Sequence, residues 1–143
     1  MVCISLKEAA QIVDAALEKG HELGLAPLTV VVLDPGGYPV AIKREDGSGL
    51  LRCDVATAKA WGPLAMGWGG KELVERANRA PAFFSALTTL SGGRMLPVPG
   101  GVPIHNAASE LVGSVGVSGD TADNDEVCAV HGIQTAGLVA ALD

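Results

Sequence analysis

The chain begins with a helical pattern of apolar and polar positions. Ser5 and Glu8 stand three residues apart, the spacing of a capping box in which each side chain binds the other residue's backbone amide. Gly24 and Pro27 follow as typical helix-ending residues. Between these signals, apolar and small residues recur at helical spacing on one face: Leu6, Ala9, Ala10, Val13, Ala16, Leu17 and Gly20. The pattern predicts an amphipathic helix that ends near Gly24.

A run rich in β-branched residues comes next. Residues 28–34, Leu-Thr-Val-Val-Val-Leu-Asp, predict a buried strand. The turn at residues 35–37, Pro-Gly-Gly, separates it from a second predicted strand at residues 38–44. The short connection predicts an antiparallel hairpin.

The middle of the chain carries helical patterns broken by glycine and proline. Residues 54–66 predict a helix with Asp54 as a candidate N-cap, and Gly62-Pro63 is expected to kink or end it. A further helix is predicted at residues 71–77. Pro81 suits the first turn of another short helix, which reaches about Leu90.

The last third predicts strands followed by a helix. Residues 94–104 predict one or two short strands, residues 111–118 another, and residues 123–126 the cap of a final helix. That helix carries a narrow stripe of mostly small residues, which favours close packing against a sheet or a partner helix: Ala129, Ile133, Ala136, Gly137 and Ala140. Helices that do not alternate strand by strand indicate an α+β fold with an antiparallel sheet, and residues 1–143 predict a single domain.

Composition narrows the function classes. Hydrophobic residues make up 48% of the 143 positions but aromatic residues only 3%, so the core is expected to consist of Val, Leu, Ile and Ala. The net charge of −6 and scattered basic residues argue against a nucleic-acid partner. No signal-peptide pattern, membrane-length apolar run or basic amphipathic helix is present, so we expect no membrane contact. Three widely spaced cysteines indicate free thiols in a cytoplasmic protein: Cys3, Cys53 and Cys128.

Several stretches together resemble the GlcG/HbpS-like family, also described as haem-degrading or PduO C-terminal-like domains. The clearest are residues 99–104, Pro-Gly-Gly-Val-Pro-Ile, and residues 113–119, Gly-Ser-Val-Gly-Val-Ser-Gly. The others lie in the same order over nearly the whole chain: residues 30–37, residues 44–47, Lys59-Ala60, and Asp125-Glu126 with Ala129. The chain departs from the family pattern at Trp61-Gly62-Pro63, where family members usually continue as helix.

The resemblance implies a profilin-like fold, with a five-stranded antiparallel sheet flanked by helices. It also implies a homo-oligomer, a hexamer or an octamer, that binds haem or a related tetrapyrrole. Family members are described in which a first-helix histidine ligates haem, so His21 is the candidate iron ligand and is expected to point inward or into an interface. No Cys-x-x-Cys-His motif is present, so a bound haem would be an exchangeable haem b. Met66 and Met95 are either soft axial ligands or core residues.

The candidate ligand-binding residues are either basic or are glycines, whose backbone no side chain covers. Gly100 and Gly101 stand between prolines and form either a patch that a ligand or subunit can approach, or a rigid strand-entry turn. Arg44, Lys59 and Arg94 can bind a carboxylate or a haem propionate, or form ordinary surface ion pairs with neighbouring acids.

An alternative function is a cofactor-independent isomerase, decarboxylase or lyase that acts on a small carboxylate. His105 would be its general acid or general base, because the preceding Gly-Pro segment holds the residue in a fixed position. Asn106 would orient the substrate or the imidazole, and either Glu110 or Asp120 would orient the ring and raise its basicity. The competing interpretation leaves His105 exposed on a strand without a role. A third interpretation is an assembly protein without a pocket.

Overall fold

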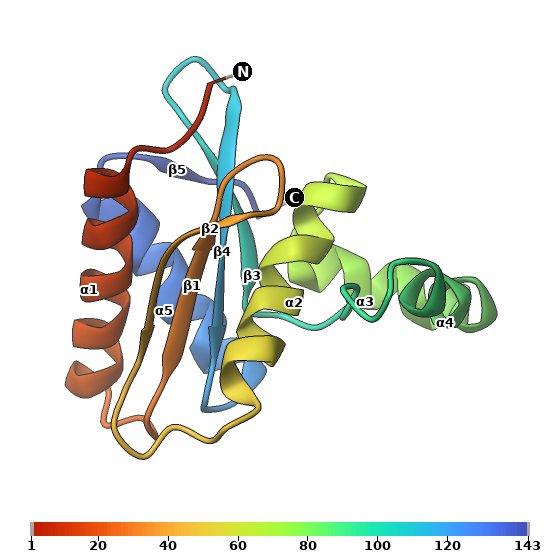
Figure 1. Ribbon diagram of the computed structural model, residues 1–143, viewed down its shortest axis with the longest axis horizontal. Helices are drawn as coiled ribbons and strands as arrows, with labels where there is room; N and C mark the ends of the chain where they lie inside the picture. Colours follow the sequence, from red (N-terminus) through yellow and green to blue (C-terminus); the bar gives the residue numbers. More distant parts are fainter. Residues whose placement is uncertain (1, 143) are drawn as a thin grey trace.

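A five-stranded antiparallel sheet lies between two layers of helices in the computed structural model, which describes residues 2–142 (Figure 1). The strand order is β2-β1-β4-β3-β5. Along the chain the elements are α1 (Leu6–Glu22), β1 (Thr29–Leu33), β2 (Pro39–Arg44), α2 (Arg52–Met66), α3 (Gly70–Arg79), α4 (Pro81–Leu90), β3 (Gly101–His105), β4 (Leu111–Ser118), α5 (Ala122–Thr135) and β5 (Val139–Ala140). The predicted α+β fold with five antiparallel strands is confirmed.

Strand β1 shows how the two faces of the sheet are covered. All five of its residues are buried, and successive side chains point to opposite faces. Val30 and Val32 belong to the large core that α1 and α5 cover, whereas Val31 and Leu33 pack against α2. The predicted hairpin is confirmed, with Val31 paired to Ile42.

Helix α1 starts as predicted and packs against α5. The Ser5 Oγ accepts a hydrogen bond from the Glu8 amide, and Glu8 Oε1 accepts one from the Ser5 amide. A Cβ atom at Gly132 of α5 would lie 2.6 Å from the Ile12 carbonyl oxygen of α1, so the two helices touch backbone to backbone. Of the predicted small-residue stripe, Ala129 and Ile133 are buried in the core, whereas Ala136, Gly137 and Ala140 lie beyond the end of α5. The stripe therefore gives no argument for a partner helix.

Helix α2 runs unbroken through Pro63 to Met66, so the predicted kink or end at Gly62-Pro63 is wrong. Tertiary packing overrides the helix-breaking tendency of glycine and proline, because both residues are buried in the C-terminal part of the helix. The helix ends instead at Gly67, which adopts the left-handed conformation (φ 79°) that glycine tolerates.

Three other predictions are corrected at the ends of elements. The α5 N-cap is Thr121, whose side chain accepts from the Asn124 amide, while Asp123 and Asp125 lie in the first turn. Helix α2 begins at Arg52 after Leu51, which offers no side-chain cap, so Asp54 is not the N-cap. Strand β5, Val139–Ala140, was not predicted, because two residues are too few to show the alternation of apolar and polar positions that indicates a strand.

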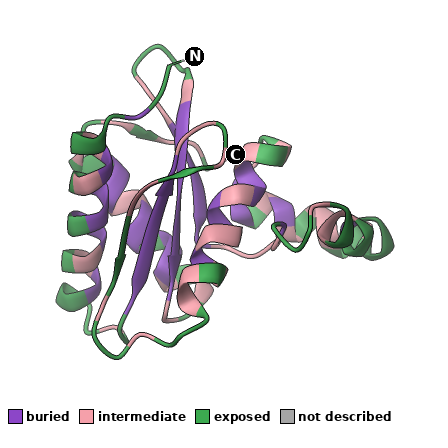
Figure 2. Cartoon of the chain, in the orientation of Figure 1, coloured by how far each residue is buried: buried purple, intermediate pink, exposed green. Residues whose placement is uncertain are grey.

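Helices α3 and α4 form an arm that projects beyond the sheet (Figure 1). Leu73 of α3 is fully buried beside Gly62 and anchors the arm to α2. Most of α4 is exposed, as Figure 2 shows. Within this helix only Phe84 is buried. Within residues 2–142, no helix has the length and apolarity needed to span a bilayer.

Candidate functional site

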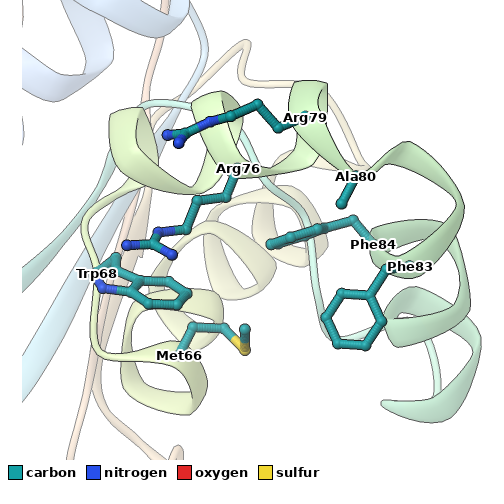
Figure 3. A pocket seen from close by; sticks show the side chains of 7 residues that line it. All are labelled: Met66, Trp68, Arg76, Arg79, Ala80, Phe83 and Phe84. Atoms are coloured by element: carbon teal, nitrogen blue, oxygen red, sulfur yellow. The ribbon is translucent and has the colours of Figure 1, made fainter.

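A cavity with a volume of about 280 Å³ opens between the end of α2 and the projecting arm (Figure 3). We call it the arm cavity, and its lining residues are Met66, Trp68, Arg76, Arg79, Ala80, Phe83 and Phe84. Its volume lies close to the lower limit of small-molecule sites, which measure about 300–1,000 Å³. The lining combines apolar side chains with two guanidinium groups.

Breaks between helices place these side chains around one space. Gly67 ends α2 and turns the chain so that Trp68 faces the arm. Ala80, with φ −138° and ψ 62°, separates α3 from α4, and Pro81 starts α4 at its first position. The rings of Phe83 and Phe84 then meet edge to face, with centroids 5.8 Å apart and planes at 86°.

The two arginines give the arm cavity its charge. The Arg76 guanidinium lies 3.7 Å from the centroid of the Trp68 ring, and its Nε donates to Glu72 Oε1 at 2.8 Å. The Arg79 side chain is mostly exposed, and its closest carboxylate oxygen, on Glu75, is 3.9 Å away. Aromatic walls with guanidinium groups at their edge suit a flat, apolar ligand that carries carboxylates.

A second hollow contains Arg94, one of the predicted ligand-binding residues. The Arg94 guanidinium stacks 4.6 Å from the centroid of the Trp61 ring, and its Nε donates to the Ser91 carbonyl oxygen. Gly37, Asp54 and Thr57 also line this hollow. Arg94 is exposed there and can bind an anion, as the sequence suggested.

Lys59 is buried in an internal network, which differs from both of its expected environments. Its Nζ donates to the Val117 carbonyl oxygen at 2.9 Å and to Asp125 Oδ2 at 3.0 Å. Gly100 and Gly101 pack directly on it, because Cβ atoms there would lie 3.0 Å from Lys59 Nζ and 1.7 Å from its carbonyl oxygen. The bare backbone of these glycines is therefore covered by α2 of the same chain.

His105, Asn106 and Glu110 lie at the turn between β3 and β4, and they line none of the cavities described above. Asn106 Oδ1 accepts from the Ala108 and Glu110 amides, and its Nδ2 donates to Glu110 Oε1. These bonds close the hairpin, so Asn106 and Glu110 hold each other and neither bonds the half-buried His105. A catalytic role for His105 stays a prediction.

His21 points into solvent, so the prediction that it points inward is wrong for the single chain. Its imidazole is 71% exposed and bonds the carboxylate of Glu45, which also accepts from the Leu28 amide. Gly20 occupies the core-facing position instead, packed against Leu28. Arg44, at the end of β2, is exposed as well. Helix α1 and the arm lie on opposite sides of the molecule (Figure 1), so one copy cannot bring His21 to the arm cavity.

The three cysteines are free thiols in the structure, as expected. Burial, reinforced by the nearby Asp125 carboxylate, raises the pKa of the Cys128 thiol to about 11. Cys128 is therefore a packing residue at neutral pH, not a nucleophile. Within residues 2–142, no three His, Cys, Asp or Glu side chains are grouped to bind a metal ion.

Sequence reasoning did not identify most of the arm cavity. Arg76 and Arg79 are three residues apart on one short helix, and Phe83-Phe84 follows directly after the next helix start. In a chain with only 3% aromatic residues, this adjacent pair was the available signal. The break before Pro81 was predicted, but the convergence of these side chains depends on the backbone conformation at Ala80, which no sequence pattern indicated.

Known proteins match this sequence over most of its length. The model of the family described as "Haem degrading protein HbpS-like" matches residues 4–134. An uncharacterised 15.0 kDa protein of Citrobacter freundii, from the dhaT-dhaS intergenic region, is 26% identical over 126 residues, which cover 88% of this chain and 87% of that protein.

Solved structures share the fold. The PduOC:haem complex superposes with a TM-score of 0.87 at 24% identity, covering 98% of this chain and 99% of that one. A double mutant of HbpS from Streptomyces reticuli gives a TM-score of 0.80 at 28% identity, covering 94% and 87%. Because the family model spans nearly the whole sequence, this chain belongs to the HbpS-like family of haem-degrading proteins.

Proposed function

We propose that this domain binds haem or a related tetrapyrrole, and that the macrocycle occupies the arm cavity. The family description supports this ligand, as does the likeness to HbpS. The observation that carries the proposal is the composition of the arm cavity, in which aromatic side chains form walls and two arginines lie beside them. This arrangement matches an apolar ring system with carboxylate substituents.

The residues present fit the parts of such a ligand. Trp68, Phe83 and Phe84 would contact the ring face through apolar area. Arg79, whose nearest carboxylate oxygen lies 3.9 Å away, would bind a propionate. Arg76 would bind a propionate less freely, because Glu72 and Trp68 already hold its guanidinium. When bound, haem would supply an iron centre that the protein itself lacks.

Removing one aromatic wall should weaken this binding. We expect Phe83→Ser to reduce haemin affinity by about tenfold or more, since a buried aromatic contact is worth roughly 1.5–3 kcal/mol. Phe83 is 57% exposed in the free protein, so the change should leave the fold intact. The matched control is Leu90→Ser, on the same helix but outside the cavity, which should bind haemin normally. Equal affinities of the two variants by Soret titration would place the ligand elsewhere.

Two residues compete for the role of iron ligand. Met66 offers a thioether inside the arm cavity, whereas His21 offers an exposed imidazole on the opposite side of the molecule. A haem held by His21 would expose its ring to water unless a second copy covered it. With the macrocycle in the arm cavity, we expect Met66→Leu to shift the Soret band and His21→Ala to leave it unchanged. The reverse result would support the histidine ligand that the family resemblance implies.

We further propose that the domain works as a homo-oligomer in the cytoplasm, where free thiols persist, with a hexamer or octamer as the implied size. Its exposed large apolar side chains support assembly, among them Leu50 at 84%, Leu6 at 66% and Leu51 at 65% exposure. Sedimentation at micromolar concentration is expected to show a species several times heavier than 14.5 kDa. A single species at 14.5 kDa would contradict assembly without affecting the ligand proposal.

A further inference from the structure

The outer side of α2 forms one wall of the hollow that contains Arg94. Four residues of the helix line that wall at helical spacing: Asp54, Thr57, Ala58 and Trp61. The buried residues of α2 face the sheet instead. We call this space the Arg94 hollow. Its volume is about 280 Å³, close to the lower limit of small-molecule sites, which measure about 300–1,000 Å³.

The Arg94 guanidinium is held in position but keeps most of its donors. The segment that follows α4 returns from the arm past α2 (Figure 1) and places the guanidinium 4.6 Å from the centroid of the Trp61 ring. Its Nε donates to the Ser91 carbonyl oxygen at 2.7 Å, so the N–H groups of its two terminal nitrogens remain free. No carboxylate of residues 2–142 forms an ion pair with it. Arg94 is therefore preorganised to bind a carboxylate through two parallel hydrogen bonds.

Hydrogen-bond acceptors lie along the same wall, towards the start of α2. Asp54 is exposed in the first turn of the helix, and no cation of residues 2–142 pairs with its carboxylate. Thr57 Oγ donates to the Cys53 carbonyl oxygen at 2.7 Å, so its own lone pairs are free to accept. Asp54 and Arg94 are the only charged side chains among the described lining residues. The Arg94 hollow thus presents one unpaired negative charge and one unpaired positive charge.

We propose that the Arg94 hollow binds a short linear zwitterion, an amino acid whose carboxylate and ammonium groups lie at opposite ends. The carboxylate bonds Arg94, and the ammonium group bonds Asp54 and Thr57. Helix α2 rises by about 10 Å between Asp54 and Trp61, so the two charged groups of the ligand are separated by several bonds. A simple anion or a simple cation would leave one charge of the hollow unpaired. The arm cavity and the Arg94 hollow share no lining residue, so the inference does not depend on haem binding.

The two tryptophans of the chain report on the two sites separately, because Trp61 lines the Arg94 hollow and Trp68 lines the arm cavity. The first experiment titrates the full chain with γ-aminobutyrate and follows both indole N–H signals by NMR, with Trp61→Phe to assign them. We expect a saturable shift of the Trp61 signal and none of the Trp68 signal. Butyrate lacks the ammonium group and butylamine lacks the carboxylate, so each should bind at least about tenfold more weakly. Equal binding of either probe, or no saturable shift of Trp61 with γ-aminobutyrate, would overturn the proposal.

The second experiment tests the two contacts one at a time. Arg94→Gln and Asp54→Asn should each weaken γ-aminobutyrate binding by about tenfold or more, and both residues are exposed, so the fold should stay intact. Asp54→Asn should still bind butyrate at least as well as the unchanged protein does, because butyrate has no group that bonds Asp54. Arg44→Gln removes another exposed arginine, outside the hollow, and is the control that should bind γ-aminobutyrate normally. Unchanged γ-aminobutyrate affinity of Asp54→Asn would show that the hollow recognises an anion alone, and the zwitterion proposal would then be wrong.

Discussion

Replacing Gly101 with alanine should nearly abolish folding. A Cβ atom at this position would lie 1.7 Å from the Lys59 carbonyl oxygen, and that atom belongs to the backbone of α2 and cannot rotate away. Helix α2 must then move off the sheet that it covers. We expect a loss of roughly 3–5 kcal/mol in the free energy of unfolding, a large part of the total of about 5–15 kcal/mol.

Urea denaturation measures this loss, with Gly24→Ala as the control. Gly24 also has a backbone conformation that favours glycine (φ 68°), but nothing lies within 4 Å of its added Cβ. Its replacement should therefore cost only about 1 kcal/mol of backbone strain. If Gly101→Ala is no less stable than Gly24→Ala, α2 does not approach β3 as closely as the structure shows.

The fold was predictable because several local signals agree with tertiary packing. The capping box at Ser5, the run of valines in β1 and the start of α4 at Pro81 all form as expected. The failure at Pro63 has a physical cause, since the buried Gly62 and Pro63 fit against neighbouring side chains that no local pattern encodes. Local propensity gives way where packing against other parts of the chain, here Leu73 and Met95, supplies the energy.

The segments that carry the family resemblance meet at one structural network, not at a ligand site. Lys59, Gly100, Val117 and Asp125 come from four of those stretches, and all lie in contact. The arm cavity lies outside them. Sequence reasoning placed the chemistry near residues 100–105 because Gly and Pro in a loop are typical of ligand contact as well as of tight backbone packing. The packing of α2 on Gly101 favours the second explanation.

Breaking the Lys59–Asp125 pair should be the other large perturbation. The lysine and aspartate side chains are only 6% and 1% exposed, and their charged atoms lie 3.0 Å apart. Asp125 Oδ1 also accepts from the Asp120 amide, and Lys59 Nζ also binds the Val117 carbonyl oxygen. Lys59→Met removes the cation and leaves a buried carboxylate with a single donor. We expect a loss of roughly 3–5 kcal/mol in the free energy of unfolding.

A second substitution should recover part of that loss. In the double variant Lys59→Met/Asp125→Asn the buried negative charge is gone, while the amide oxygen can still accept from the Asp120 amide. The double variant should therefore be more stable than Lys59→Met alone by roughly 1–3 kcal/mol, measured by urea denaturation of the two variants.

Burial, not distance, is the reason for this expectation, and a surface pair of the same chain tests it. Lys43 Nζ lies 2.7 Å from Asp14 Oδ1, closer than the buried pair, but the two side chains are 57% and 54% exposed. Lys43→Met should change stability by less than about 1 kcal/mol, because water solvates and screens both charges. If Lys59→Met costs no more than Lys43→Met, water must enter the Lys59 network. The buried pair would then hold α2 to α5 no more firmly than the surface pair holds β2 to α1.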